Sequence, residues 1–93
     1  MEFEWDEAKA ESNLKKHGIS FDDGAEALQD KHVVIYEDAR RDYGELRWVG
    51  TGNSHEGVLT VVFTRRDDRT RIISARKANT DERHDYSHHS QDV

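Results

Sequence analysis

The basic side chains of this sequence are concentrated in one segment. Residues 60–78 carry a net charge of +4, although the whole chain carries −6. Arginine suits phosphate groups because its planar guanidinium donates two parallel hydrogen bonds and does not lose its charge. If these side chains share a face, they form a local phosphate site on an otherwise acidic protein. The basic residues of the segment are Arg65, Arg66, Arg69, Arg71, Arg76 and Lys77.

These arginines fall into two groups. Arg66 and Arg69 flank two aspartates, a pattern typical of a solvated hairpin tip. The other arginines lie in predicted strands, where we expect phosphate contact: Arg65, Arg71 and Arg76. Arg71 and Arg76 are five residues apart and point to opposite faces of a regular strand, so they converge only if a twist or bulge intervenes.

A carboxylate and an arginine form a second candidate group. Glu45 and Arg47 are two residues apart and point to the same side of a strand, provided that the strand begins that early. Such a pair would place a base beside a phosphate clamp. The competing interpretation is a surface ion pair that contributes little to stability, and spacing alone favours it because such pairs are common on sheets.

Aromatic and histidine side chains offer weaker candidates. His17 precedes Gly18, a pattern typical of the end of a helix, and the sequence supplies no partner for proton transfer. Trp5 shares one side of a predicted strand with Phe3 and is expected in the core. Trp48 is as compatible with base stacking as with a core position.

Two histidines near the end of the sequence have a spacing that can bind a metal. His84 and His88 are four residues apart on a predicted helix. No third ligand has a suitable spacing, and residues 87–92 read as a polar terminus. We therefore predict no metal and no other cofactor. Tyr86, on the same helix, is a further outside candidate for catalysis.

The composition predicts one small domain of modest stability. Of the 93 residues, 33% are hydrophobic and 37% are charged, so little apolar surface is available to offset conformational entropy. A partner that covers part of the surface would stabilise such a chain. No apolar run has the length of a membrane span, and no leader resembles a signal peptide. The absence of cysteine suits the cytoplasm.

Sequence periodicity predicts an α+β fold. A strand at residues 3–5 precedes a helix that Asp6 caps and Gly18 stops, and Ser20 opens a short second helix. A terminal helix opens at Asn79 and runs to about Tyr86 or beyond. Four β-rich runs lie between the helices, at residues 33–36, 46–49, 58–63 and 71–75.

The connections predict the arrangement of these elements. Short turns between the later strands are typical of an antiparallel meander. We expect the two N-terminal helices to pack on one face of a small, curved antiparallel sheet. Residues 1–93 then form a single domain, with a polar tail from about residue 88.

Three stretches resemble the BrnT-type toxins of bacterial type II toxin–antitoxin systems. Residues 3–21 contain the motifs F-E-W-D, K-A, N and K-H-G-x-S-F at the family's spacings. Residues 44–48 match the family's G-E-x-R-aromatic motif. The third stretch is residues 71–78, R-I-I-S-A-R-K-A, followed by Glu82, Arg83 and Tyr86. Ser87 departs from the pattern, because the family usually has an acidic residue there.

The resemblance implies a RelE/ParE-like fold and a ribonuclease toxin that cleaves messenger RNA. Its partner would be a cognate antitoxin, typically a ribbon-helix-helix protein of the BrnA type, and promoter DNA would be bound only through that antitoxin. Cleavage by internal transfer needs a base, an acid and cations beside the phosphorane, but no metal. The candidate catalytic residues are Glu45, Arg47, Arg65, Arg71 and Arg76.

Two other functions remain open at this point. The chain would be a non-catalytic module that binds an antitoxin as a transcriptional co-repressor, or a relative of the ParE-type poisons of topoisomerase. Growth arrest accompanied by RNA decay separates ribonuclease activity from both.

Overall fold

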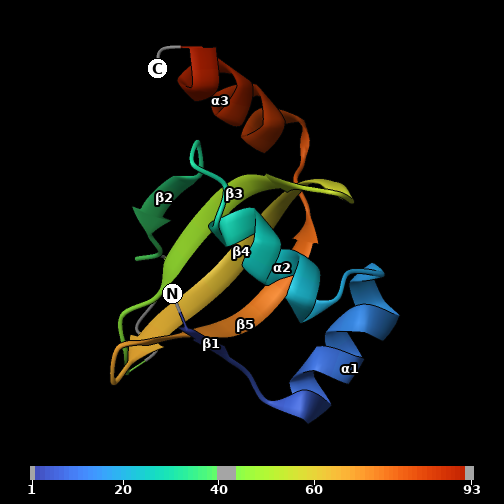
Figure 1. Ribbon diagram of the computed structural model, residues 1–93, viewed down its shortest axis with the longest axis vertical. Helices are drawn as coiled ribbons and strands as arrows, with labels where there is room; N and C mark the ends of the chain where they lie inside the picture. The colour runs from blue at the N-terminus through green and yellow to red at the C-terminus, as the bar shows by residue number, and fades with distance from the viewer. Residues whose placement is uncertain (1, 40–43, 92–93) are drawn as a thin grey trace.

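The protein is an α+β domain built on a five-stranded sheet (Figure 1). The computed structural model describes residues 2–39 and 44–91, with side chains as far as His89. The predicted α+β class is confirmed. In chain order the elements are β1 (Glu2–Glu4), α1 (Glu7–His17), α2 (Phe21–Leu28), β2 (Val34–Glu37), β3 (Trp48–Ser54), β4 (Gly57–Arg66), β5 (Arg69–Lys77) and α3 (Thr80–Gln91).

Local signals set the ends of the first two helices. The Asp6 side chain accepts a hydrogen bond from the backbone N–H of Lys9 at 3.1 Å and caps α1. Gly18 ends α1 with a φ of 72°, which a side chain would disfavour, and its N–H donates to the Leu14 carbonyl. Ser20 caps α2 by accepting from the N–H of Asp23. The predicted caps are confirmed.

The sheet is mixed, which corrects the prediction that it is antiparallel throughout. Its order is β1-β5-β4-β3-β2, and β2 to β5 form the predicted antiparallel meander. β1 instead pairs in parallel with β5, with Phe3 opposite Thr70. The meander and both N-terminal helices separate these strands in the sequence, so the connection is long enough to allow a parallel pair.

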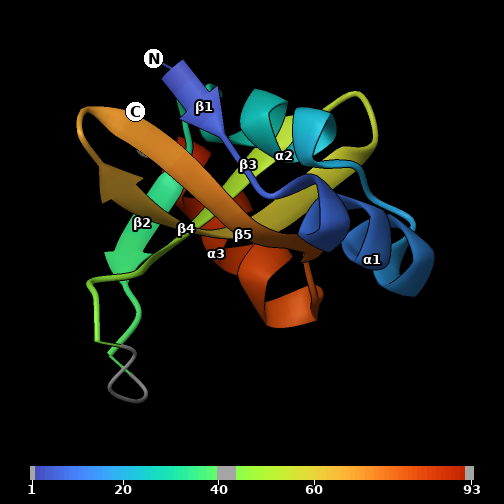
Figure 2. The same ribbon diagram turned by 90° about the horizontal axis from the view of Figure 1, so that it is seen from below.

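The core lies between α2 and one face of the sheet. Figure 2 shows α1 and α2 on one side of the sheet and α3 on the other. Phe21 and Leu28 of α2 join Leu59, Val61 and other buried residues of the strands in one apolar cluster. The helix sits very close to β3, because a Cβ at Gly52 would lie 2.1 Å from the Ala27 carbonyl oxygen.

One buried asparagine fastens α1 to the edge of β5. The Asn13 amide nitrogen donates to the carbonyl oxygens of Ala75 and Ile19, at 2.8 and 3.0 Å. Its oxygen accepts from the N–H of Ala75 at 3.1 Å. The side chain therefore satisfies backbone groups of β5 beyond the end of β1, where an open strand edge would otherwise remain.

A bulge in β5 changes which side chains share a face. Phe63 of β4 is opposite Ile72, but Val62 is opposite Ser74, so Ile73 is an extra residue in β5. Ile72 and Ala75 are consequently both buried in the core although they are three residues apart. The same offset brings Arg71 and Arg76 to one face, which a regular strand would prevent.

The terminal helix α3 leans against the opposite face of the sheet. It opens with a reciprocal cap, in which Asn79 and Glu82 each accept a hydrogen bond from the other's backbone N–H. The Tyr86 hydroxyl donates to the Asp30 carboxylate. The helix extends to Gln91, so residues 88–91 of the predicted polar tail are helical, and residues 92–93 lie outside the described residues. None of the described helices is long and apolar enough to span a membrane.

Candidate active site

The side of the sheet that faces away from α1 and α2, here called the open face, carries most of the predicted site residues. The register fixes its composition, because directly opposed residues on neighbouring strands point to the same side. Thr60 is opposite Arg76, and Thr64 is opposite Arg71. α3 covers one end of this face (Figure 2). The bulge in β5 is therefore what places two of the predicted arginines on one face of the sheet.

Arg76 is held in place by Glu82 at the start of α3. Its two terminal nitrogens donate to the two carboxylate oxygens of Glu82, at 2.7 and 2.8 Å. Glu82 also accepts from the Thr60 hydroxyl at 3.0 Å. The hydrogen bonds from Arg76 are the main reason that the pKa of Glu82 falls to about 2, against the opposing effect of its burial. The pair is ionised at neutral pH and fixes the guanidinium.

Arg71 is paired with the first strand. Its Nη1 donates to the Glu4 carboxylate at 2.7 Å, across the parallel pair of β5 and β1. Both side chains are about a quarter exposed, so the ion pair is partly shielded from water. Arg71 is thus positioned on the open face, with its charge matched by a neighbouring carboxylate.

Glu45 and Arg47 meet as predicted, but just before a strand and not within one. β3 begins at Trp48, and the Arg47 Nε donates to Glu45 at 3.3 Å. Arg66 reaches the other oxygen of Glu45, also at 3.3 Å. Burial alone would raise the pKa of Glu45, but the hydrogen bonds from Arg66 and Arg47 outweigh it and lower the pKa below the ordinary value. Glu45 is therefore an ionised carboxylate between two cations.

The structure does not bring Arg65 to the open face. Arg65 is opposite Thr70, which is opposite Phe3, and all three lie on the side of α1 and α2. Arg66 was assigned to the solvated hairpin tip, yet it reaches the open face and contacts Glu45. The alternation of β4 explains the difference, because Arg65 is in phase with the core residue Phe63 and Arg66 is not.

Two small hollows lie in the open face, and Arg76 lines the smaller of them. One, of about 140 Å³, is lined by Tyr36, Asp38, Arg76 and Glu82, among others. The second, of about 280 Å³, lies under α3 and shares Tyr36 and Glu82. Tyr36 is 52% exposed and offers a flat ring on which a base can stack next to a phosphate clamp. Sequence reasoning missed Tyr36, although its alternation with Val34 was a usable signal.

The remaining aromatic candidates have structural roles. Trp48 stacks on Phe63 at 6.0 Å between ring centroids and packs against the core, so it is not a base-stacking residue of the open face. Trp5 meets Phe21 edge-on and packs against the core as predicted. Burial and the hydrogen bond to Asp30 raise the pKa of Tyr86 to about 12, which makes it a poor acid.

A group of metal-ligand residues lies far along the chain from the terminal histidines. Asp23, His55 and Glu56 place one ligand atom each within 4.8 Å of one another. His55 Nδ1 also contacts Glu26 at 2.7 Å, and this hydrogen bond leads the effects that raise the pKa of the imidazole. Three carboxylates thus favour a protonated His55. The group joins α2 to the turn between β3 and β4, apart from the arginines.

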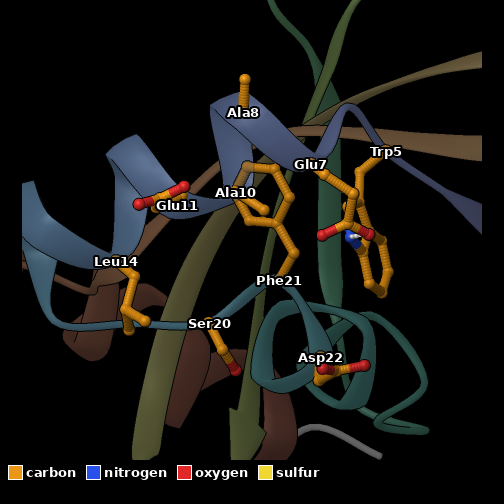
Figure 3. A pocket seen from close by; sticks show the side chains of 9 residues that line it. All are labelled: Trp5, Glu7, Ala8, Ala10, Glu11, Leu14, Ser20, Phe21 and Asp22. Atoms are coloured by element: carbon orange, nitrogen blue, oxygen red, sulfur yellow. Dashed lines mark hydrogen bonds between the residues drawn. The ribbon is translucent and has the colours of Figure 1, made fainter.

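A larger hollow, formed by α1 and the start of α2, has the wrong charge for a polyanion. Figure 3 shows the rings of Trp5 and Phe21 between α1 and the start of α2, in a groove of about 540 Å³. Its other lining residues include the acidic side chains Glu7, Glu11 and Asp22. No lysine or arginine of the described residues lines the groove to offset these carboxylates, whereas Arg76 lines a hollow of the open face, so the groove is not part of the candidate site.

Comparison with known proteins identifies the family. A family model described as the ribonuclease toxin BrnT of type II toxin–antitoxin systems matches residues 5–82. No curated protein matches the chain. The matched region contains Glu45, Arg47, Arg71, Arg76 and Glu82, and it spans most of the sequence. The chain therefore belongs to the BrnT family, the ribonuclease toxins of type II toxin–antitoxin systems.

Proposed function

We propose that the open face is the ribonuclease site of this toxin and that it cleaves RNA without a metal ion. The observation that carries the proposal is that the bulge of β5 places Arg71 and Arg76 on one face of the sheet, each held by a carboxylate. Preorganised cations of this kind stabilise the charge that develops on a phosphorane. Tyr36 adds a stacking surface beside Arg76.

The residues divide the chemistry among them. Glu45 takes the proton from the 2′-hydroxyl, whose oxygen attacks the neighbouring phosphorus. Arg71 and Arg76 stabilise the added negative charge, and Arg47 keeps Glu45 in place. The bond to the 5′-oxygen breaks, and that oxygen leaves with a proton from a general acid. The products are a 2′,3′-cyclic phosphate and a 5′-hydroxyl. Arg65, on the other side of β4, contributes only to RNA attraction.

The proposed setting is that of a RelE/ParE-like fold in the cytoplasm, with residues 1–93 acting as a single toxin domain. The α+β architecture and the meander that carries the arginines support this assignment. Messenger RNA is the proposed substrate. No metal or other cofactor is required, because arginine and carboxylate side chains supply both the positive charge and the proton acceptor.

We further propose that the cognate antitoxin is a ribbon-helix-helix protein of the BrnA type that covers residues 60–78. Shielding the phosphate site is the simplest way to silence the nuclease. Promoter DNA is then bound through the antitoxin alone, which the acidic net charge of this chain supports. Hydrogen exchange should show protection of β4 and β5 in the complex. Protection confined to the acidic groove of Figure 3 would contradict this placement.

The direct test is cleavage of a defined RNA with and without EDTA, followed by analysis of the new ends. We expect equal rates under both conditions and products with 5′-hydroxyl ends. A 2′-deoxy nucleotide at the cut site should stop the reaction, because it removes the nucleophile. Loss of activity in EDTA with recovery on adding a divalent ion would refute the metal-free mechanism.

The ion pairs of the open face favour one rival. Because the described arginines of this face are matched by carboxylates, a module that binds an antitoxin as a co-repressor, without catalysis, would keep the same contacts. Expression in cells separates the two. The ribonuclease predicts growth arrest with RNA decay, whereas the co-repressor predicts neither, and a topoisomerase poison predicts arrest with DNA damage.

A further inference from the structure

A second basic site lies where α1 meets the edge of β5. It is a shallow hollow of about 200 Å³. Lys9, Lys16 and His17 line it from α1, and Ile73 and Ser74 line it from β5. The two strand residues are those at the bulge. The hollow therefore includes the same irregularity that places Arg71 and Arg76 on one face.

The charges of this hollow have no internal counterpart. Its lining, all within the described residues, contains no carboxylate. Among the ion pairs of the described residues, none engages Lys9 or Lys16, whereas Arg71 and Arg76 are each bound by a glutamate. On a chain with a net charge of −6, two lysines around one hollow that form no ion pair among the described residues favour the binding of an external anion.

Ser74 belongs both to the hollow and to the open face. Ser74 is opposite Val62 on the open face and also lines the hollow. It lies two residues from Arg76, or about 7 Å along the strand. Asn13 fixes the spacing between the lysines and β5, because it hydrogen-bonds the Ala75 backbone from the same helix.

We propose that this hollow binds a backbone phosphate of single-stranded RNA, one that flanks the phosphate held on the open face. The inference rests on the proposed ribonuclease site and names a binding subsite for its substrate. Lysine acts on phosphate as a point charge without sequence preference, and the hydroxyls of Ser12 and Ser74 are available as hydrogen-bond donors. The subsite contributes affinity and takes no part in the chemical step.

The test measures binding of a uniformly 2′-O-methylated single-stranded oligonucleotide, which lacks the nucleophile and cannot be cleaved. The double variant Lys9→Ala/Lys16→Ala is compared with Lys15→Ala/Lys31→Ala, which removes the same charge from exposed sites outside the hollow. We expect the dissociation constant to rise roughly fivefold to tenfold in the first variant and less than twofold in the second. Because the hollow holds one phosphate, the slope of log K against log salt should fall by about 0.7 only in the first.

Equal changes in the two double variants would overturn the proposal, because they would reflect net charge alone. In the wild-type protein, the amide signals of Lys16 and Ser74 should shift on adding the oligonucleotide, and unshifted signals would also overturn it. If these signals shifted on adding poly-glutamate but not on adding the oligonucleotide, the hollow would be assigned to an acidic protein instead. The oligonucleotide assay needs no catalysis, so an inactive open face leaves its outcome interpretable.

Discussion

Two basic regions of this toxin differ in how their charges are balanced. On the open face, Arg71 and Arg76 are each bound by a carboxylate at 2.7 Å. At the edge of β5, Lys9 and Lys16 surround a hollow whose lining has no acidic residue. The first region is built from strands that the sheet holds in register, and the second from one helix fastened to that sheet by Asn13.

The difference assigns separate tasks to the two regions. A paired arginine is fixed in position, but its field at a distance is largely cancelled by the carboxylate. An unpaired lysine attracts a polyanion from solution, but its flexible side chain is poorly preorganised. Arginines of the open face should therefore act mainly on the rate of cleavage, and lysines of the hollow mainly on RNA binding.

The largest effect is expected from removing Arg76. Losing one preorganised cation beside the phosphorane should cost about 2–4 kcal/mol in the transition state, or roughly a hundredfold or more in rate. Arg76→Lys should recover only part of the activity, because the two-pronged hydrogen bond is lost. The measurement is single-turnover cleavage after circular dichroism has shown that each variant is folded.

Arg65→Ala is the matched control for this prediction. Arg65 lies on the opposite side of β4, so its removal should leave the single-turnover rate within about twofold of the wild type, as expected of an exposed charge. An essential Arg65 with a dispensable Arg76 would mean that the reaction takes place on the other side of the sheet.

Asn13→Ala tests the link between the two regions. The substitution removes three hydrogen bonds and leaves backbone groups of Ala75 and Ile19 unsatisfied, so unfolding should become easier by about 2–3 kcal/mol. Urea denaturation measures the change. Relative to the wild type, the variant should show a larger increase in hydrogen exchange in α1 and at Ala75 than in the central strand β4. An equal increase in all elements would contradict a local link.

Glu82→Gln should separate two effects of Arg76: the fixed position of its guanidinium and its electrostatic attraction for RNA. Without the carboxylate, Arg76 keeps its charge but loses its bidentate partner, so cleavage should slow by roughly tenfold while the oligonucleotide binds more tightly. The loss of a charge-assisted pair should also cost about 1–3 kcal/mol in stability. Weaker binding together with unchanged cleavage would show that Glu82 does not restrain Arg76.

The pH dependence of the same pair is a smaller and more local effect. The pKa of Glu82 is lowered from 4.5 to about 2, so its stabilising contribution is complete above about pH 4.5 and is lost as the pH falls through about 2. The Asn79 amide, which donates to Glu82, reports on this titration by NMR. Its chemical shift should have a midpoint near pH 2 in the wild type and show no such step in Glu82→Gln.

Local signals in the sequence predicted the helices well. Asp6, Gly18 and Asn79 act on backbone groups within a few residues, so their roles can be read without knowing the fold. The parallel pairing of β1 could not be predicted in this way, because it depends on where the chain returns after α1, α2 and the meander.

The candidate site was predicted less completely than the fold. Residue types pointed to Arg71 and Arg76, but their shared face depends on a bulge that no local pattern reveals. The partners Glu4 and Glu82 arise from tertiary contacts, and Glu82 had a sufficient explanation as a helix cap. Arg65 was predicted to contact phosphate and Arg66 to lie at the hairpin tip. The alternation of β4 from Phe63 onward places Arg65 on the side of α1 and α2, and Arg66 on the open face.

The rate of cleavage and the affinity for RNA thus depend on different basic regions of the toxin. The most direct test of this division is a single-turnover cleavage series over RNA or protein concentration, comparing Arg76→Ala with Lys9→Ala/Lys16→Ala. For Arg76→Ala, we expect a maximal rate at least roughly a hundredfold lower, with little change in the concentration at half-saturation. We expect the reverse for the lysine variant, with half-saturation raised roughly fivefold to tenfold and an unchanged maximal rate. Both variants altering the same parameter would contradict this division.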